Sequence, residues 1–234
     1  MRIDLNADVA EGVGNEAELL PLVTSANVAC AAHAGSPADI WFTLQLAKRL
    51  GVVVGAHPGY FDREHFGRRE LSWQPESLHA ELVYQLSALQ GLAQAAGVQL
   101  HYLKPHGALY NQACREEPLA DLLARLAKQW NLALVGLPNS WLERCAARQG
   151  VRFCREGFAD RRYQPDGSLV PRHRADAFVD DPQQAAQQVL RLVEEYRVQT
   201  VCVHGDRPGV VAFTRHLREE LERRGVTVRP WCVS

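Results

Sequence analysis

Residues 101–111 read HYLKPHGALYN, a short apolar run that stops abruptly in a lysine, a proline, a histidine and a glycine. Pro105 ends the expected strand because it cannot donate an amide, and Gly107 permits the chain to leave in a sharp turn. Side chains alternate along an extended chain, so Lys104 and His106 are predicted to lie on the same side and to face one pocket. This change from a buried strand to a polar turn recurs along the chain, and the recurrence predicts the fold.

Seven apolar runs of strand length alternate with helical patterns. The runs lie at residues 3–5, 26–30, 52–54, 98–103, 132–137, 151–154 and 200–203. Helices are expected between most of them, including residues 36–51, 78–97 and 181–196, from caps and from apolar residues that share one face. The alternation, with no linker and no change of composition, predicts one α/β domain with a parallel sheet over residues 1–234.

An open, doubly wound sheet is the alternative arrangement for this pattern. A dinucleotide-binding sheet of that kind has a glycine-rich turn after its first strand. Residues 6–12 here read NADVAEG, with acids where phosphate-binding amides are expected, and the chain contains no Gly-Lys-Ser or Gly-Lys-Thr sequence. The sequence therefore favours a β/α barrel.

The composition indicates a small ligand and a reducing compartment. The 234 residues carry 26 basic and 27 acidic side chains, so there is no electrostatic footprint for nucleic acid or for an anionic membrane. The six cysteines include no CxxC pair and are expected to be buried free thiols. No apolar segment resembles a secretion signal or approaches the ~18 residues of a membrane span. We therefore expect a cytoplasmic protein.

Polar side chains follow six of the seven apolar runs. They are Asn6, Asp8, His33, His57, Lys104, His106, Glu156, Asp160, His204 and Asp206. Taken singly, each has a structural explanation, as a helix cap, a satisfied histidine or a turn residue. In a β/α barrel, however, the carboxyl ends of all strands meet at one rim. We therefore expect these groups to surround one pocket.

Seven ordered blocks of sequence carry a resemblance to a known family. They are DLNAD with EG at residues 4–8 and 11–12, SANVAC with HAG at 25–30 and 33–35, GAHPGY with FGRR at 55–60 and 66–69, KPHGALYN at 104–111, GFADR at 157–161, LVPR at 169–172 and VHGD at 203–206. On these blocks the chain resembles the LamB/YcsF lactam-utilisation family, the family of the A subunit of 5-oxoprolinase. A family cysteine is replaced by Ala7, which excludes a nucleophilic thiol there. Two family glycines correspond to Ala10 and Ala31, so the resemblance does not predict the shape of the loop after Asp8.

The resemblance implies a fold, a reaction and partners. The implied fold is a single-domain (β/α)7 barrel of the glycoside hydrolase and deacetylase type. The implied reaction is the ATP-dependent opening of the lactam ring of 5-oxo-L-proline to L-glutamate, with ATP converted to ADP and phosphate. The working enzyme is implied to contain two partners, the 5-oxoprolinase subunits B and C. Because no nucleotide loop is recognisable, the sequence leaves open whether ATP binds to this chain or at an interface between subunits.

Lactam hydrolysis suggests a role for each candidate residue. Lys104 is predicted to neutralise charge on the carbonyl or phosphoryl oxygen, and a proton from the attacking water is expected to pass to Asp8 or to a histidine, with His57 and His106 preferred. Lysine occurs at only three positions, against twenty-three arginines, which favours a need for a compact ammonium at position 104. A second group is predicted to bind the substrate: Asn6, His33, Asp160, Arg161, His204 and Asp206, with His204 and Asp206 as a pair.

Two alternatives from other functional classes remain open. An ATP-independent, metal-dependent hydrolase of the deacetylase type could use Asp8, His33 and His57 as ligands, although no short His-x-x-x-His spacing is present. A non-catalytic subunit could use the same polar rim only to bind the lactam. Elemental analysis after chelation tests the first alternative, and turnover by Asp8→Asn and His57→Ala variants tests the second.

Overall fold

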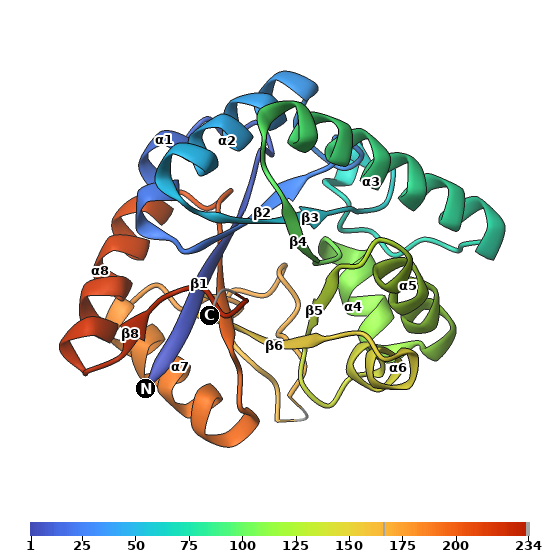
Figure 1. Ribbon diagram of the computed structural model, residues 1–234. Helices are drawn as coiled ribbons and strands as arrows, with labels where there is room; N and C mark the ends of the chain where they lie inside the picture. Colours follow the sequence, from blue (N-terminus) through green and yellow to red (C-terminus); the bar gives the residue numbers. More distant parts are fainter. Residues whose placement is uncertain (166, 233–234) are drawn as a thin grey trace.

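Seven parallel strands close into a barrel in the computed structural model, which describes residues 1–165 and 167–232 (Figure 1). The strands are β1 (Arg2–Val9), β2 (Ser25–Ala29), β3 (Val53–His57), β4 (Leu100–Leu103), β5 (Ala133–Gly136), β6 (Phe153–Phe158) and β7 (Thr200–His204). Each strand pairs with the next along the chain, and β1 closes the ring by pairing with both β2 and β7. A two-residue strand, β8 (Thr227–Val228), lies parallel to the start of β1.

Helices surround the barrel and cover its outer face (Figure 1). They are α1 (Glu16–Leu19), α2 (Pro37–Leu50), α3 (Pro75–Ala96), α4 (Gly107–Arg115), α5 (Glu117–Gln129), α6 (Trp141–Gln149), α7 (Pro182–Tyr196) and α8 (Val210–Arg223), with 3-10 turns η1 (Leu20–Leu22) and η2 (Arg63–His65). The outward residues of β1, Ile3 and Leu5, share one apolar core with helix residues such as Leu44 and Leu86. The predicted (β/α)7 barrel is confirmed.

Helices α2 and α7 begin where their capping residues predict, whereas α3 begins at Pro75, three residues before the predicted start at 78, and ends before Gly97 as predicted. Ser36 accepts a hydrogen bond from the amide of Asp39 at the start of α2, and Asp181 accepts one from the amide of Gln183 at the start of α7. Gly51 ends α2 in the left-handed conformation, with φ of 69°. Local sequence signals therefore determine these boundaries.

The interior of the barrel is polar along β1 and β7, which the sequence analysis did not predict. The strand β1 extends past Asn6 and Asp8, so its alternate residues Asp4, Asn6 and Asp8 all point inward and are buried. Asp4 accepts a hydrogen bond from the hydroxyl of Thr200, and the amide of Asn6 donates to Glu156 at 3.1 Å. The first bond joins β1 to its neighbour β7, and the second joins β1 to β6, the next strand around the barrel. Polar residues that were expected after the strands thus lie partly within them.

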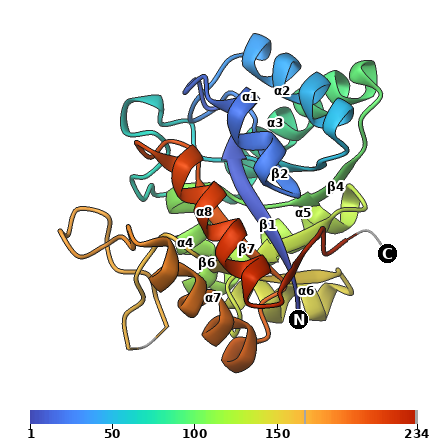
Figure 2. The same cartoon turned by 90° about the vertical axis from the view of Figure 1, so that its left-hand side faces the viewer.

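The loops at the carboxyl ends of the strands gather on one side of the barrel. Figure 2 shows the loops after β3, β6 and β7 on the same side, opposite the N-terminus. This is the rim at which the candidate residues were expected to meet. Among the described residues, no helix has both the length and the apolar character that crossing a membrane requires.

Candidate functional site

A buried lysine lies at the centre of the polar lumen. The Lys104 ammonium is 2.9 Å from Glu156 Oε1 and 3.0 Å from Asp8 Oδ1, and it also contacts Asn6 Oδ1 at 3.3 Å and Cys202 Sγ at 3.1 Å. Burial by itself lowers the pKa of an ammonium, but the neighbouring carboxylates outweigh it and raise the pKa of Lys104 well above its usual range. Lys104 is therefore a permanent cation inside the barrel.

Asp8 joins the lysine to the cavity at the rim. Burial by itself would raise the pKa of Asp8, but the ammonium of Lys104 and the adjacent imidazole of His57 outweigh it and hold that pKa well below its usual range. In the described part of the chain the polar contacts of this carboxylate use Oδ1, including a hydrogen bond from the amide of Asn27 at 2.8 Å. Asp8 also lines the rim cavity. Its Oδ2 is therefore the atom that a water in the cavity can reach.

His57 and His106 form a pair whose facing nitrogens share one proton position. His57 Nδ1 is 2.8 Å from the carbonyl of Lys104, and His106 Nε2 is 2.9 Å from the carbonyl of Phe66, so both of these nitrogens must carry hydrogen. The other two nitrogens, His57 Nε2 and His106 Nδ1, face each other at 2.9 Å. Two lone pairs at that distance repel, and one proton between them makes a hydrogen bond. The pair is thus arranged to take up a single proton beside Asp8, which lies 3.5 Å from His57 Nε2.

Glu11 and His33 complete this cluster, although Glu11 was not predicted as a site residue. Glu11 Oε1 lies 3.2 Å from His33 Nε2 and 3.3 Å from His106 Nδ1, and the rings of His33 and His106 stack at 3.7 Å. Burial and the charges of Asp8 and Asp206 raise the pKa of Glu11 well above its usual range. Burial, with the nearby histidines, lowers the pKa of both His33 and His106. The raised pKa of Glu11 and the lowered pKa values of the histidines both favour the neutral forms, in which protonated Glu11 donates a hydrogen bond to a neutral imidazole.

The backbone around this cluster is held in the left-handed conformation. Ala10 and Ala31 have φ of 59° and 60°, at the positions where the family pattern has glycine. The loop therefore keeps the glycine conformation without glycine, which places strain of about 1 kcal/mol at each site. Gly35 packs so closely that a Cβ would lie 1.9 Å from the carbonyl oxygen of Ala10. The left-handed backbone conformation explains why the family pattern has glycine at the positions of Ala10 and Ala31.

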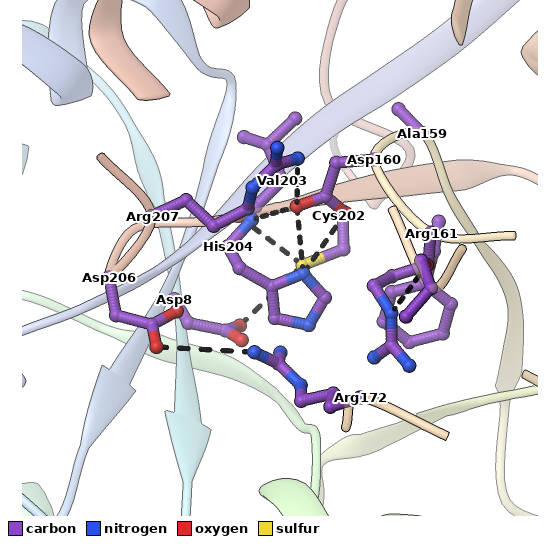
Figure 3. Close-up of polar contacts among 12 residues, drawn as sticks. Asp8, Ala159, Asp160, Arg161, Arg172, Cys202, Val203, His204, Asp206 and Arg207 are labelled. Atoms are coloured by element: carbon purple, nitrogen blue, oxygen red, sulfur yellow. Dashed lines mark hydrogen bonds and ion pairs between the residues drawn. The ribbon is translucent and has the colours of Figure 1, made fainter. Parts of the chain in front are cut away.

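A second group of polar residues lies beside the first, around the end of β7 (Figure 3). His204 Nδ1 is 3.0 Å from both oxygens of Asp160, and Arg207 lies 3.6 Å from the same carboxylate. Burial by itself would raise the pKa of Asp160, but the charges of His204 and Arg207 lower it to about 2. Asp160 therefore orients His204 as a fixed carboxylate.

The cavity between the two groups is small and open to solvent at the rim. Its volume is 40 Å³, far below the ~300 Å³ at which ordinary ligand sites begin. Side chains from the ends of β1, β3, β4, β6 and β7, or from the segments that follow them, line it: Asp8, His57, Arg68, Lys104, His106, Tyr110, Asn111, Phe158, Arg161, Leu169, Arg172 and His204. The prediction that Lys104 and His106 face one pocket is confirmed.

Three predicted substrate-binding positions differ from their expected roles. Asn6 is buried below the cavity and bonds to protein groups, so its amide holds the lumen together rather than a ligand. His204 pairs with Asp160 and not with Asp206. Asp206 instead binds Arg68 at 2.5 Å, because the loop after β7 turns this carboxylate towards the loop after β3. His33 lies against Glu11, and the guanidinium of Arg161 lines the cavity.

The predicted metal ligands fall into two separate clusters. His33 and His57 share a group with Glu11 and His106, whose ligand atoms all lie within 4.8 Å of one another. Asp8 belongs to the other group and already contacts the ammonium of Lys104. Three imidazoles and a carboxylate are ligands that zinc accepts. The four-residue cluster therefore fits a divalent cation better than the trio of Asp8, His33 and His57.

A sequence profile of the LamB/YcsF family matches residues 3–233. The chain belongs to the LamB/YcsF family. A curated family relative from Neisseria meningitidis serogroup C (strain 053442), named as the A subunit of 5-oxoprolinase, is 47% identical over 97% of this chain and 98% of its own length. The family resemblance inferred from the seven sequence blocks is confirmed.

Solved structures place the family barrel among related folds. A lactam utilization protein from Thermus thermophilus is 41% identical, with a TM-score of 0.89 over 98% of this chain and 99% of that one. The catalytic domain of a peptidoglycan N-acetylglucosamine deacetylase from Eubacterium rectale has a TM-score of 0.54 over 98% of this chain and 87% of that one, at 14% identity. The second likeness concerns the fold alone and agrees with the predicted deacetylase-type barrel.

Proposed function

We propose that this chain is the A subunit of an ATP-dependent 5-oxoprolinase and opens the lactam ring of 5-oxo-L-proline to give L-glutamate. The observation that supports it best is the connected series Lys104, Asp8, His57 and His106 at the rim cavity. It combines a buried cation, an ionised carboxylate and a proton-accepting imidazole pair. The chain that carries it is 47% identical to a protein named as the A subunit of 5-oxoprolinase.

Asp8 and the histidine pair perform the proton transfers in this proposal. The Oδ2 atom of Asp8 orients the attacking water, and the facing nitrogens of His57 and His106 take its proton. The pair then returns this proton to the ring nitrogen as the carbon–nitrogen bond of the lactam breaks. Water adds its oxygen to the carbonyl carbon, and the products are a carboxylate and an amine. A second water accounts for the conversion of ATP, so the whole reaction takes 5-oxo-L-proline, ATP and two waters to L-glutamate, ADP and phosphate.

Lys104 contributes charge rather than a direct bond to the substrate. Its ammonium already contacts Asp8, Glu156, Asn6 and Cys202, so no proton of the ammonium is spare in this arrangement. A fixed cation in a water-poor site stabilises negative charge that develops on the carbonyl oxygen. It also keeps Asp8 ionised. Lys104 thus keeps its predicted role of neutralising charge on the carbonyl oxygen, but by electrostatic attraction from inside the barrel and not by a hydrogen bond to the substrate.

The chain has no sequence feature of a nucleotide site. No phosphate-binding loop occurs in the sequence. A larger cavity, of 520 Å³, lies away from this site and shares only Glu156 with the lumen residues described above. In this proposal ATP binds outside the barrel mouth, on the partner subunits B and C or at their interface with this chain.

The cellular setting is part of the same proposal. All six cysteines are free, and four of them are buried. Free thiols of this kind support a reducing compartment. We therefore propose a cytoplasmic complex of this chain with subunits B and C.

A metal-dependent hydrolase of the deacetylase type is the second candidate function. The ligand atoms of Glu11, His33, His57 and His106 favour it, since they could hold a divalent cation. Such a cation would supply Lewis-acid activation of a carbonyl or of water. Elemental analysis of the purified chain before and after chelation separates the candidates. A stoichiometric metal whose removal abolishes ATP-independent turnover favours the hydrolase.

Reconstitution tests the first proposal. The purified chain is mixed with its B and C subunits, and glutamate release from 5-oxo-L-proline is measured with and without ATP. Release that requires both this chain and ATP supports the proposal. Release that proceeds equally without this chain contradicts it.

A further inference from the structure

The mouth of the cavity holds more positive than negative charge. Arg68, Arg161 and Arg172 reach it from the loops after β3 and β6, and all three line it. Asp206, from the loop after β7, lies 2.5 Å from Arg68 and 4.0 Å from Arg172. Asp160 does not compensate the excess, because it is paired with His204 and Arg207. Two guanidinium groups therefore share one carboxylate at the entrance.

Arg161 adds a third charge without a carboxylate partner. It is 4% exposed, and its guanidinium donates to the backbone carbonyls of Val170 and Ala177. In the described part of the chain this group forms no ion pair. Burial and the neighbouring Arg172 lower the pKa of Arg161 to about 10, and burial with Arg68 lowers the pKa of Arg172. Both shifts reflect cations held close together in a partly dehydrated place.

Aromatic faces lie beside all three guanidinium groups. Arg68 lies 4.6 Å from the ring centre of Phe66, and Arg161 and Arg172 lie 5.2 and 5.7 Å from that of Phe178. Figure 3 shows Arg161 and Arg172 directed to the space beside His204, with Asp206 opposite Arg172. The groups are thus oriented before any ligand binds, which limits the entropy that binding must overcome.

We propose that Arg68 and Arg172, supported by Arg161, form a subsite that binds the carboxylate of an acidic lactam and makes the site specific for lactams that carry one. The inference rests on the proposed function and adds the residues that recognise the carboxylate of the substrate. An incoming carboxylate replaces Asp206 as the partner of the two arginines. Planar guanidinium groups match a carboxylate through paired N–H donors, which a lysine cannot do. This proposal assigns to arginines the role first expected of Asn6, His33 and the supposed pair of His204 with Asp206.

Binding to the purified full chain tests the subsite without requiring turnover. Calorimetry compares 5-oxo-L-proline with 2-pyrrolidinone, the same lactam without a carboxylate. The wild type is expected to prefer 5-oxo-L-proline. Arg172→Gln and Arg68→Gln are each expected to weaken its binding by about tenfold or more and to leave 2-pyrrolidinone unchanged. Arg172→Lys is expected to recover part of the loss.

Arg174→Gln is the matched control, because Arg174 lies on the same loop but pairs with Asp176 at the surface. It should bind both lactams as the wild type does. Equal affinity of the wild type for the two lactams, including failure to bind either, overturns the proposal, and so does equal weakening of both by Arg172→Gln. Inorganic phosphate is a third probe. If phosphate alone binds in a manner that depends on Arg172, the assignment to a carboxylate is wrong. The result is independent of glutamate release, so failure of the subsite and of the proposed function can be distinguished.

Discussion

Replacing Lys104 with methionine should destabilise the barrel in a manner that depends on pH. The substitution leaves Asp8 and Glu156 buried without the ammonium that lies 3.0 and 2.9 Å from them. At an effective dielectric constant of ~20, each contact is worth roughly 5 kcal/mol of Coulomb energy. Two effects offset part of this energy: the desolvation penalty of the ammonium disappears, and the two carboxylates can take up protons. We therefore expect the unfolding free energy to fall by about 3–5 kcal/mol at pH 8.

The loss should be smaller at low pH. Without Lys104, burial raises the pKa of Asp8 above its value in the unfolded chain, so the variant binds protons more tightly when folded and is more stable below that pKa. Urea unfolding of the wild type and the variant at pH 5 and at pH 8 measures the loss of unfolding free energy at each pH. A variant within about 1 kcal/mol of wild type at pH 8, or one with the same deficit at both pH values, would refute the reasoning. Lys104→Arg retains the charge but not the compact shape, and retention of most glutamate release by it in the complex would show that a compact ammonium is unnecessary.

Three further substitutions test the lumen and the backbone around it. Burial raises the pKa of Asp4 to about 6, so the unfolding free energy of the wild type should fall by about 3 kcal/mol as the pH rises through 6. The Asp4→Asn variant should lack this fall when both proteins are unfolded with urea at pH 4 and at pH 7. Equal pH dependence of the two proteins would contradict the raised pKa of Asp4. Ala10→Gly should raise the unfolding free energy by about 1 kcal/mol, because Ala10 has a φ of 59°. As a control, Ala95→Gly on the exposed face of helix α3 should lower the unfolding free energy by about the same amount. A decrease at both positions would count against backbone strain at Ala10. Gly107→Ala should lower the melting temperature, because the added Cβ would lie 2.6 Å from a backbone oxygen. As a control, Gly91→Ala, in open space on α3, should raise the melting temperature. An unchanged melting temperature for Gly107→Ala would contradict the close packing at this position.

The order of strands and helices was predictable because its signals are local. Each strand is an apolar run, and caps such as Ser36 and glycines such as Gly51 mark helix ends within a few residues. The convergence of Asp8, His57 and Lys104 on one cavity was also predictable, since a barrel brings all strand ends to one rim. Topology alone therefore supplied the central part of the site.

Pairings between side chains of distant loops were not predictable. Whether His204 meets Asp160 or Asp206 depends on how the loop after β7 turns, and both acids lie near a strand end in the sequence. Arg68 and Arg172 read as two arginines among twenty-three, with nothing local to show that they share one carboxylate.

The polar lumen, in contrast, left a signal that could have been used. Asp4, Asn6 and Asp8 alternate with apolar residues at a period of two, and Thr200, Cys202 and His204 do the same on the neighbouring strand. That alternation indicates one polar face and one apolar face on each strand. In a barrel whose helices cover the apolar face, the polar face can only be the lumen.

Glutamate release by the reconstituted complex containing the Asp8→Asn variant tests the central claim most directly. Asparagine keeps the size of the side chain and removes the negative charge that Lys104 holds in place. If this chain performs the hydrolysis, ATP-dependent release should fall at least about a hundredfold, as expected when a group that activates the attacking water is lost, while binding of 5-oxo-L-proline persists. Turnover equal to that of the wild-type complex would contradict the account and show that the chain only binds the lactam.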